Sequence, residues 1–137
     1  MSPGSRVAEV MMRHDRASEW LGMTVVVNEP GHSVVTMTIR ENMLNGFAIT
    51  HGGFVFALAD TAFAIACNDS DLVTVAAGAD ITFLKATTAG DVLTATAIER
   101  AKSGRSGIYD VEVLDADGAI VAEFRGRSRR TNSPAPV

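Results

Sequence analysis

The sequence predicts an α+β fold in which an antiparallel sheet wraps around one buried helix. Residues 54–67 are apolar almost throughout, which is typical of a helix that is buried on every side. The segments after this helix are rich in Val, Ala and Thr, and short polar turns separate most of them. Because short turns can join only antiparallel strands, the sheet is predicted to be antiparallel.

Length and composition narrow the classes of protein that fit. The chain has 137 residues, 47% of them hydrophobic, which predicts a single domain over residues 1–137 with a sizeable core. A net charge of −4 disfavours nucleic acid as a partner, because nucleic-acid-binding domains usually carry a basic surplus. No apolar run approaches the roughly 20 residues that cross a bilayer. Together with the lack of a secretion-signal pattern, this favours a cytoplasmic protein without a membrane partner.

The residues that commonly hold metals or cofactors are sparse. Cys67 is the only cysteine, so no intrachain disulfide can form, and it is expected to be a small core residue rather than a nucleophile. His14 and His32 lack the spacing of metal ligands, so no metal site is expected. No phosphate-binding or dinucleotide-binding motif is present, so no cofactor is expected either.

The first third of the chain predicts a short surface helix followed by a β-hairpin. Apolar residues recur at helical spacing within residues 7–14. Residues 23–28 and 33–39 are predicted strands, and the Glu29-Pro30-Gly31 sequence between them is a strong turn signal. The termini, residues 1–5 and 131–137, are rich in Ser, Pro and Gly and are predicted to be flexible.

An irregular loop, residues 40–50, leads into the long helix. Thr50 is its predicted N-cap, because a threonine hydroxyl can accept a hydrogen bond from the first turn. Strands are predicted at residues 72–84, with a bend or bulge at Gly78, and at 92–99, 108–114 and 120–129. So short a sheet cannot enclose the helix fully, and its exposed edges predict a dimer or larger oligomer.

Basic residues are concentrated in the last third of the chain. They fit either a solvated strand face or a local patch for an anionic group on a small ligand. The seven residues are Arg100, Lys102, Arg105, Arg125, Arg127, Arg129 and Arg130.

Asp60 is the one carboxylate within the apolar helix. Its neighbours one helical turn away are Phe56, Ala57, Phe63 and Ala64, none of which can pair with it. Burying an unpaired charge is unfavourable, so Asp60 must find a partner elsewhere in the fold or lie at a cleft. A partly desolvated carboxylate is also what a general base or nucleophile requires. Spacing alone leaves the structural and the catalytic interpretations open.

The sequence His51-Gly52-Gly53 precedes the helix. Glycines at a helix start leave backbone N–H groups accessible where the helix dipole is positive, which suits an anion or a developing oxyanion. Close packing against the sheet is the alternative explanation. Gly52 and Asp60 are eight residues apart, about 12 Å along a helix, whereas reacting atoms must approach to roughly 3 Å. Gly52 of one subunit is therefore predicted to face Asp60 of a second subunit across a two-fold axis.

The segment from Asn45 to Thr61 resembles the signature of the PaaI-like acyl-CoA thioesterases of phenylacetate degradation, members of the hotdog-fold superfamily. The matching elements are Asn45, the His51-Gly52-Gly53 motif and Leu58-Ala59-Asp60. Residues 80–86 and 89–91 resemble the family segment that follows, and the similarity spans about residues 20–130. The resemblance implies a curved antiparallel β-sheet wrapped around a long central α-helix. It also implies a homodimer with its active sites at the interface, commonly assembled into a homotetramer.

The resemblance implies a role for each matching residue. Asp60 would be the general base or nucleophile, and the Gly52 N–H would polarise the thioester carbonyl. Asn45 would position water or substrate. His51 would support the helix-start loop or the substrate, and Thr61 would be a secondary polar contact beside Asp60.

Further residues are candidates for binding the substrate. Residues 103–106 resemble a turn that contacts coenzyme A phosphates in relatives, and Arg105 and Lys85 are the expected cations. Gly53 would contribute at the helix start. Phe83, with Phe47 and Phe54, would line an apolar pocket, although aromatic residues at such positions commonly belong to the core.

The predicted activity is hydrolysis of an acyl-CoA thioester, with coenzyme A as part of the substrate and no separate cofactor. Phenylacetyl-CoA or hydroxyphenylacetyl-CoA is the expected substrate, and medium-chain acyl-CoA is the alternative. A hotdog hydratase or dehydratase is less favoured, because those relatives use a catalytic His in a different motif. An acyl-CoA sensor would need an added DNA-binding segment, and about twenty residues before the first strand are too few for one.

Overall fold

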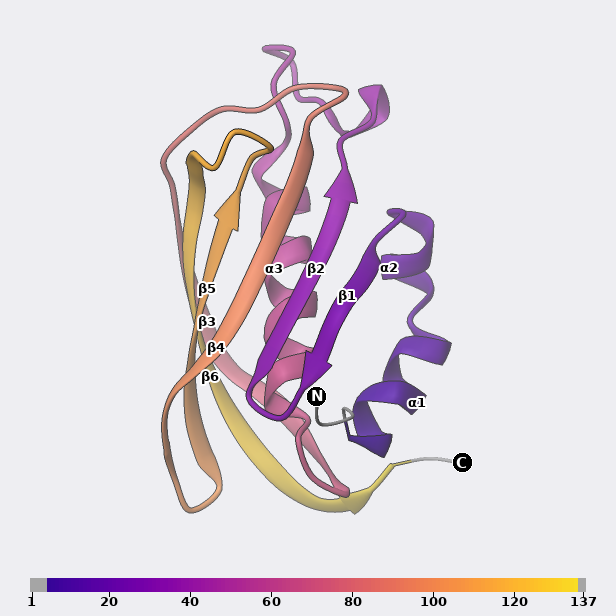
Figure 1. Cartoon of the computed structure of the whole chain (residues 1–137), viewed down its shortest axis with the longest axis vertical. Helices are drawn as coiled ribbons and strands as arrows, with labels where there is room; N and C mark the ends of the chain where they lie inside the picture. Colours follow the sequence, from indigo (N-terminus) through magenta and orange to yellow (C-terminus); the bar gives the residue numbers. More distant parts are fainter. Residues whose placement is uncertain (1–4, 136–137) are drawn as a thin grey trace.

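The computed structural model describes residues 5–135, which form one six-stranded sheet, one long helix and two short N-terminal helices (Figure 1). The helices are α1 (Arg6–His14), α2 (Arg16–Trp20) and α3 (Gly52–Cys67), with the 3-10 turn η1 (Glu41–Met43). The strands are β1 (Thr24–Glu29), β2 (His32–Thr38), β3 (Leu72–Phe83), β4 (Val92–Ser103), β5 (Ser106–Leu114) and β6 (Ile120–Pro134). No helix in this part of the chain is long and apolar enough to cross a membrane.

Every pair of neighbouring strands is antiparallel, as predicted, in the order β1-β2-β4-β5-β6-β3. The predicted hairpin of β1 and β2 and the predicted bulge at Gly78 of β3 are confirmed. The strands after α3 do not form one continuous meander, however. β3 pairs with β6 at the far edge, and β4 pairs with β2. Residues 84–91 make this crossing possible, because they form a loop rather than a tight turn.

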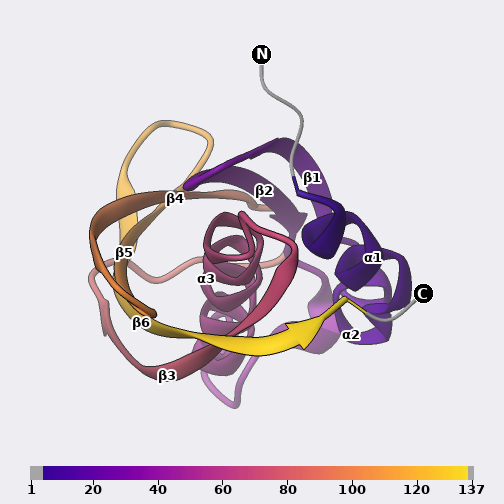
Figure 2. The same ribbon diagram turned by 90° about the horizontal axis from the view of Figure 1, so that it is seen from below.

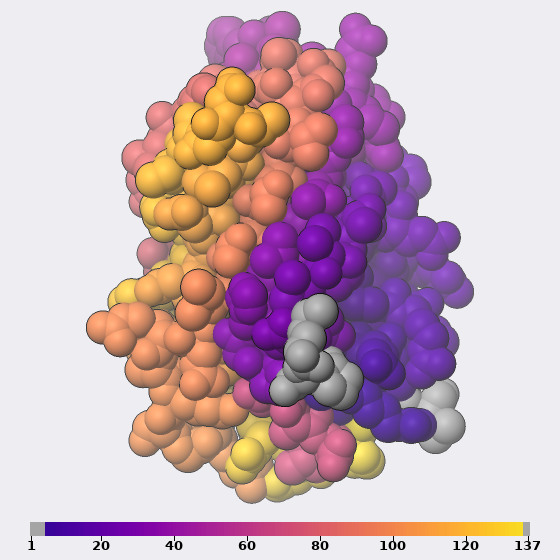
Figure 3. All heavy atoms as spheres, viewed as in Figure 1, coloured from indigo at the N-terminus to yellow at the C-terminus, as the bar shows by residue number. Residues whose placement is uncertain are grey.

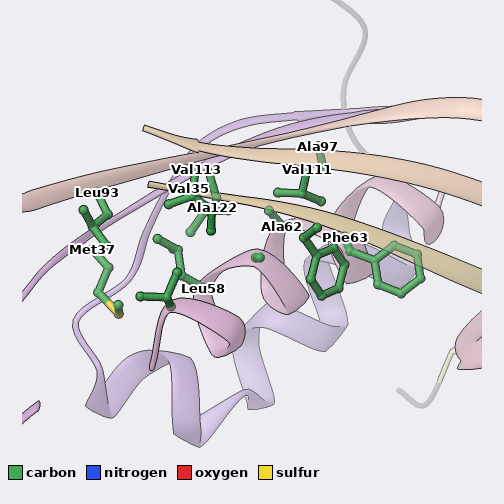
Figure 4. Packing of buried hydrophobic residues seen from close by; sticks show 14 of the residues in the cluster. Val35, Met37, Leu58, Ala62, Phe63, Leu93, Ala97, Val111, Val113 and Ala122 are labelled. Carbon is green, nitrogen blue, oxygen red and sulfur yellow. The ribbon is translucent and has the colours of Figure 1, made fainter. Parts of the chain in front are cut away.

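The sheet curves around α3, as Figure 2 shows, and α1 and α2 lie where the sheet is open. Leu58, Ala62 and Phe63 of α3 are buried against inward-facing residues of the sheet (Figure 4). Those residues are Val35, Met37, Leu93, Val111, Val113 and Ala122. The Ser33 hydroxyl donates a hydrogen bond to the carbonyl of Ala62, so β2 also holds the helix through a buried polar contact. The opposite, outer face of β1, β2 and β4 forms the surface seen in Figure 3.

The start of α3 differs from the sequence prediction. The helix begins at Gly52, and its N-cap is His51 rather than Thr50. The His51 ring Nδ1 accepts a hydrogen bond of 3.3 Å from the Gly53 N–H. Thr50 is buried, and its hydroxyl lies 2.7 Å from that of Thr87. Thr50 cannot cap the helix because it joins this end of α3 to the loop before β4.

The sheet covers α3 incompletely, as predicted, so within one subunit the helix is not buried on every side. The side chains of Phe56, Ala57, Asp60, Thr61 and Ala64 are only half-buried. These five residues recur at helical spacing and form a partly exposed stripe along α3. The sheet wraps around one face of the helix, and α2 meets the rest of it at few points.

The ends of the chain are more ordered than predicted. β6 continues to Pro134, and the Thr131 hydroxyl donates to the carbonyl of Val73 at 2.7 Å. Ser5 caps α1 by accepting from the Ala8 N–H at 3.1 Å. The prediction of flexible ends is therefore wrong for Ser5, which caps a helix, and for residues 131–134, which belong to β6. Residues 1–4, 136 and 137 lie outside the described part of the chain.

We expect Gly126→Ala to lower the free energy of unfolding by about 1–3 kcal/mol, the usual range for overpacking. A Cβ at position 126 would lie 2.7 Å from three atoms of the Phe63 ring, which is fully buried and cannot move aside freely. Urea denaturation followed by circular dichroism, at matched protein concentration, measures the change. Gly46→Ala is the control, because a Cβ there would meet nothing within 4 Å. Equal stability of the two variants would contradict this account of the core.

Candidate active site

A hollow of about 450 Å³ lies at the N-terminal end of α3. Four of the predicted site residues line it: Asn45, Gly52, Phe83 and Lys85. The remaining lining residues come from the loop before α3, the first turns of α3, the loop before β4, and β6. They are Ile49, Thr50, Val55, Leu84, Ala86, Thr87 and Val121. The sequence did not single out most of these residues, because only the crossing loop after β3 brings them to the start of α3.

The backbone N–H of Gly52 is the available donor at the start of α3. The Gly53 N–H donates to the His51 ring, and the Phe54 N–H donates to the His51 carbonyl at 3.0 Å. The Gly52 N–H has no acceptor among residues 5–135, and Gly52 lines the hollow. A Cβ at this position would lie 2.9 Å from the Phe83 ring, which explains why a glycine is needed there. The arrangement places a positive helix-end donor at a partly apolar cavity, where it can bind a developing oxyanion.

Asn45 stabilises the loop that forms one wall of the hollow. Its Oδ1 accepts from the Phe47 N–H at 2.8 Å and from the Ile49 N–H at 3.4 Å. These bonds hold Ala48 at φ 60°, a left-handed conformation that non-glycine residues seldom adopt. Asn45 therefore both shapes the loop and lines the cavity.

The predicted aromatic and basic residues are only partly brought together. Phe83 lines the hollow, whereas Phe47 is 86% exposed outside it and Phe54 packs edge-on against the His51 ring. Lys85 lies at the hollow and pairs with Asp115, which raises the pKa of the lysine. Arg105 lies in the turn between β4 and β5, at the opposite end of the 12-residue strand β4. One subunit therefore does not place Arg105 beside Lys85.

Asp60 lies farther along α3 and does not line the hollow. Burial raises the pKa of its carboxyl above the usual value, and the nearby carboxylate of Asp15 raises it further. No ion pair joins Asp60 to a basic side chain in the part of the chain that the structure describes. Asp60 is thus a half-buried acid without a compensating cation, which is an environment suited to a base.

Thr61, next to Asp60, contacts the start of α2. Its Oγ1 lies 3.0 Å from the Ser18 hydroxyl. Ser18 in turn donates to Asp15, which caps α2 by accepting from the Ser18 N–H at 2.9 Å and its hydroxyl at 2.7 Å. Sequence reasoning missed both Asp15 and Ser18. The available signal was Asp15 itself, because aspartate is one of the residue types favoured at helix N-caps.

The remaining candidate residues have structural surroundings. Cys67 is buried and its thiol pKa is raised to about 12, chiefly by burial, so it is the core residue that the sequence predicted. Among residues 5–135, no group of three or more His, Cys, Asp or Glu side chains could hold a metal ion.

The sequence and the fold are similar to those of known thioesterases. A model of the thioesterase superfamily matches residues 47–122. The acyl-coenzyme A thioesterase PaaI of Escherichia coli (strain K12) is 45% identical over 90% of this chain and 88% of that protein. The structure of the E. coli PaaI protein from the phenylacetic acid degradation operon has a TM-score of 0.91, with 43% identity and 94% of both chains covered. A hypothetical thioesterase protein of Streptococcus pneumoniae TIGR4, solved with coenzyme A, has a TM-score of 0.77 at 25% identity, over 82% of this chain and 90% of that one. The predicted hotdog fold is thereby confirmed.

We expect Asp60→Asn to raise the melting temperature at pH 7 by a few degrees. Because the folded-state pKa of Asp60 is raised, the folded state favours the protonated acid and loses stability as pH rises through that pKa. The neutral amide avoids this loss of stability. The gain in the free energy of unfolding should be about 1 kcal/mol at most, since solvent screens a partly exposed group.

Thermal unfolding from pH 4 to pH 8 measures the effect, and the gain should shrink toward pH 4. The control is Asp71→Asn, at an exposed position, which should show no such trend. A lower melting temperature for Asp60→Asn at pH 7 would mean that the ionised carboxylate is stabilised by a partner.

Proposed function

The chain belongs to the thioesterase superfamily and is a PaaI-like acyl-CoA thioester hydrolase, and we propose that it hydrolyses arylacetyl-CoA at a site shared by two subunits. The observation that carries this proposal is the position of the two functional groups on α3. The Gly52 N–H lies at the hollow, and Asp60 lies eight residues farther along. That separation, about 12 Å along the helix, favours two different subunits as their sources for one reaction.

The proposed reaction needs no cofactor, because coenzyme A is part of the substrate. The thioester carbonyl oxygen accepts a hydrogen bond from the Gly52 N–H, which stabilises the negative charge that develops on it. Water attacks the carbonyl carbon while Asp60 removes one of its protons. The carbon–sulfur bond then breaks, and Asp60 returns the proton to the departing thiolate, giving free acid and coenzyme A. Alternatively, the Asp60 carboxylate attacks first, and water hydrolyses the resulting mixed anhydride.

Two exposed features of the subunit support a dimer as the active unit. The partly exposed stripe along α3 is apolar around Asp60 and needs cover. β3 is an edge strand whose residues Val75 and Phe83 are about half-exposed. Pairing of two β3 edges about a two-fold axis would place the two α3 helices antiparallel to each other. We propose that such dimers assemble further into a homotetramer.

The lining of the hollow supports an aryl group as the acyl part of the substrate. Ile49, Val55 and Phe83 present apolar surface, to which Leu84 and Val121 contribute. The related E. coli protein is named for the phenylacetic acid degradation operon, so phenylacetyl-CoA and hydroxyphenylacetyl-CoA are the first substrates to test. Medium-chain acyl-CoA is the competing substrate. Lys85 lies at the hollow and supplies positive charge for the coenzyme A part of the substrate. The proposal includes a cytoplasmic location.

We expect phenylacetyl-CoA or hydroxyphenylacetyl-CoA to give the highest kcat/KM in a panel that includes hydroxybenzoyl-CoA and straight-chain acyl-CoA. Asp60→Ala should lower kcat by about 100-fold or more, in line with the usual contribution of a general base. Release of the free thiol measures turnover, and Asp71→Ala is the control for an exposed aspartate. Near-normal turnover by a folded Asp60→Ala protein would contradict the assignment of Asp60. A single turnover in oxygen-18 water tests the anhydride path, because label appearing in the Asp60 carboxylate would favour nucleophilic attack by Asp60.

Mixing two inactive variants tests the shared site. Gly52→Val brings a bulky side chain against Phe83 and blocks the N–H, whereas Asp60→Ala removes the base. If each site takes Gly52 from one subunit and Asp60 from the other, a mixed dimer has one intact site and one doubly defective site. Equal mixing should therefore restore roughly a quarter of wild-type activity, since half of the dimers are mixed and half of their sites work.

The two proteins are mixed by coexpression, and activity is compared with each variant alone. The control pairs two different Asp60 variants, which cannot complement each other. No recovery in a demonstrated mixed dimer would contradict the shared site, and so would a fully active monomer at assay concentration.

A further inference from the structure

Asp15, Ser18 and Thr61 form a chain of hydrogen bonds that joins α2 to α3, and the donor in each bond follows from the chemistry of the groups. Ser18 is 3% exposed, and its hydroxyl has one proton to donate. An ionised carboxylate only accepts, so this proton goes to Asp15 Oδ2, at 2.7 Å. In the 3.0 Å contact between Ser18 and Thr61, Ser18 must then accept and Thr61 must donate. The Thr61 oxygen, having given its only proton to Ser18, can offer only a lone pair to a third group.

We propose that Asp15 and Ser18 are positioning residues that hold Thr61 as a hydrogen-bond acceptor for the attacking water. The inference rests on the proposed function. A water molecule has two hydrogens, and it attacks through an oxygen lone pair. Asp60 removes one hydrogen as the base, and Thr61 Oγ1 accepts a hydrogen bond from the other. Both hydrogens are then directed toward α3, which leaves the lone pair free to face the carbonyl carbon.

The surroundings of the two residues agree with this role. Asp60 and Thr61 are adjacent and half-buried on α3, so both have surface that a water molecule can reach. Asp15 caps α2, and the buried Ser18 hydroxyl joins this helix to α3 through Thr61. A threonine hydroxyl without such a partner could rotate and donate its proton toward the water, which would oppose the attack.

Asp15 also acts on Asp60 directly. Its negative charge, after burial, is the second cause of the raised Asp60 pKa. The other titratable group near Asp60 is the Cys67 thiol, farther along α3, which is uncharged at neutral pH because its pKa is about 12. A raised pKa makes Asp60 a stronger base once it is ionised. Asp15 therefore connects the short helix α2 to the reactivity of Asp60 as well as to the orientation of Thr61.

A double-mutant cycle of Ser18→Ala and Thr61→Val tests the positioning role. Each single variant should lower kcat about five- to tenfold with KM within about twofold, the loss expected for one hydrogen bond made in the transition state. If Ser18 acts through Thr61, the double variant should be no slower than Thr61→Val alone. Thr61→Ser, which keeps the hydroxyl, should retain most of the activity. Multiplicative losses in the double variant would overturn the proposal, as would equal activity of Thr61→Val and Thr61→Ser.

Ser33→Ala is the matched control, because Ser33 is also buried and also hydrogen-bonded to α3, but to the Ala62 carbonyl. It should lower the melting temperature without lowering kcat. If Ser18→Ala does not fold, the comparison of Thr61→Val with Thr61→Ser and the Asp15 variant decide the question.

Asp15→Asn provides the second readout. Asparagine caps helices as well as aspartate does, so α2 should be retained. Asp60 must be ionised to act, and removal of the neighbouring negative charge favours the ionised form. The acid limb of the kcat/KM profile should therefore move to lower pH, while the plateau of kcat falls because the amide can donate to Ser18 and reverse the hydrogen bonds. An unmoved acid limb with an unchanged plateau would overturn the role of Asp15.

The failure of this inference can be told apart from the failure of the proposed function. If the Asp15, Ser18 and Thr61 variants show none of the expected changes while Asp60→Ala is inactive, only this inference is refuted. An active Asp60→Ala protein would refute the proposed function.

Discussion

The packing of α3 against the concave face of the sheet determines where the Gly52 N–H, Asp60 and Thr61 lie. Each fully buried large side chain such as Leu58 or Phe63 contributes about 1.5–3 kcal/mol through removal of apolar surface from water. Several such contacts fix the helix in position and in rotation. Its first turn then points the Gly52 N–H into the hollow, and its uncovered side carries Asp60 and Thr61. Because the helix is held on one face, the other face can carry a carboxylate that has no compensating cation among residues 5–135.

The polar contacts around α3 divide into those that hold the helix and those that leave a group free. Thr50 and Ser33 use their hydroxyls to join α3 to the neighbouring loop and strand. The His51 ring accepts a hydrogen bond from the Gly53 N–H, and the His51 carbonyl accepts one from the Phe54 N–H. What is left over is the Gly52 N–H and, at the middle of the helix, the Asp60 carboxylate. Among residues 5–135, the two groups proposed to act on the thioester are thus ones that the hydrogen bonds of the fold leave free.

Local sequence patterns predicted the elements well, but not the contacts between distant residues. Alternation and turn signals located the strands, a long apolar run located α3, and helix geometry separated Gly52 from Asp60. The pairing of β3 with β6 joins residues that are 39 to 62 positions apart, which no local pattern encodes. The choice of His51 over Thr50 as N-cap depends on Thr87, which only the fold brings near. Ser18 was missed for the same reason, since its partner Thr61 is 43 residues away.

A site shared by two subunits, as proposed, would couple catalysis to association, because its two halves lie at the start and the middle of one helix. In the proposed dimer, the partner's first helical turn would cover part of the stripe around Asp60. Removal of water from this stripe would disfavour the ionised Asp60 carboxylate. Its pKa, which burial and the charge of Asp15 already raise within one subunit, would then rise further. The same step would bring the Gly52 N–H to the carbonyl that Asp60 serves. Dimer formation would then supply the oxyanion donor and strengthen the base in one event, while a lone subunit keeps a weaker base exposed to water and separated from its donor.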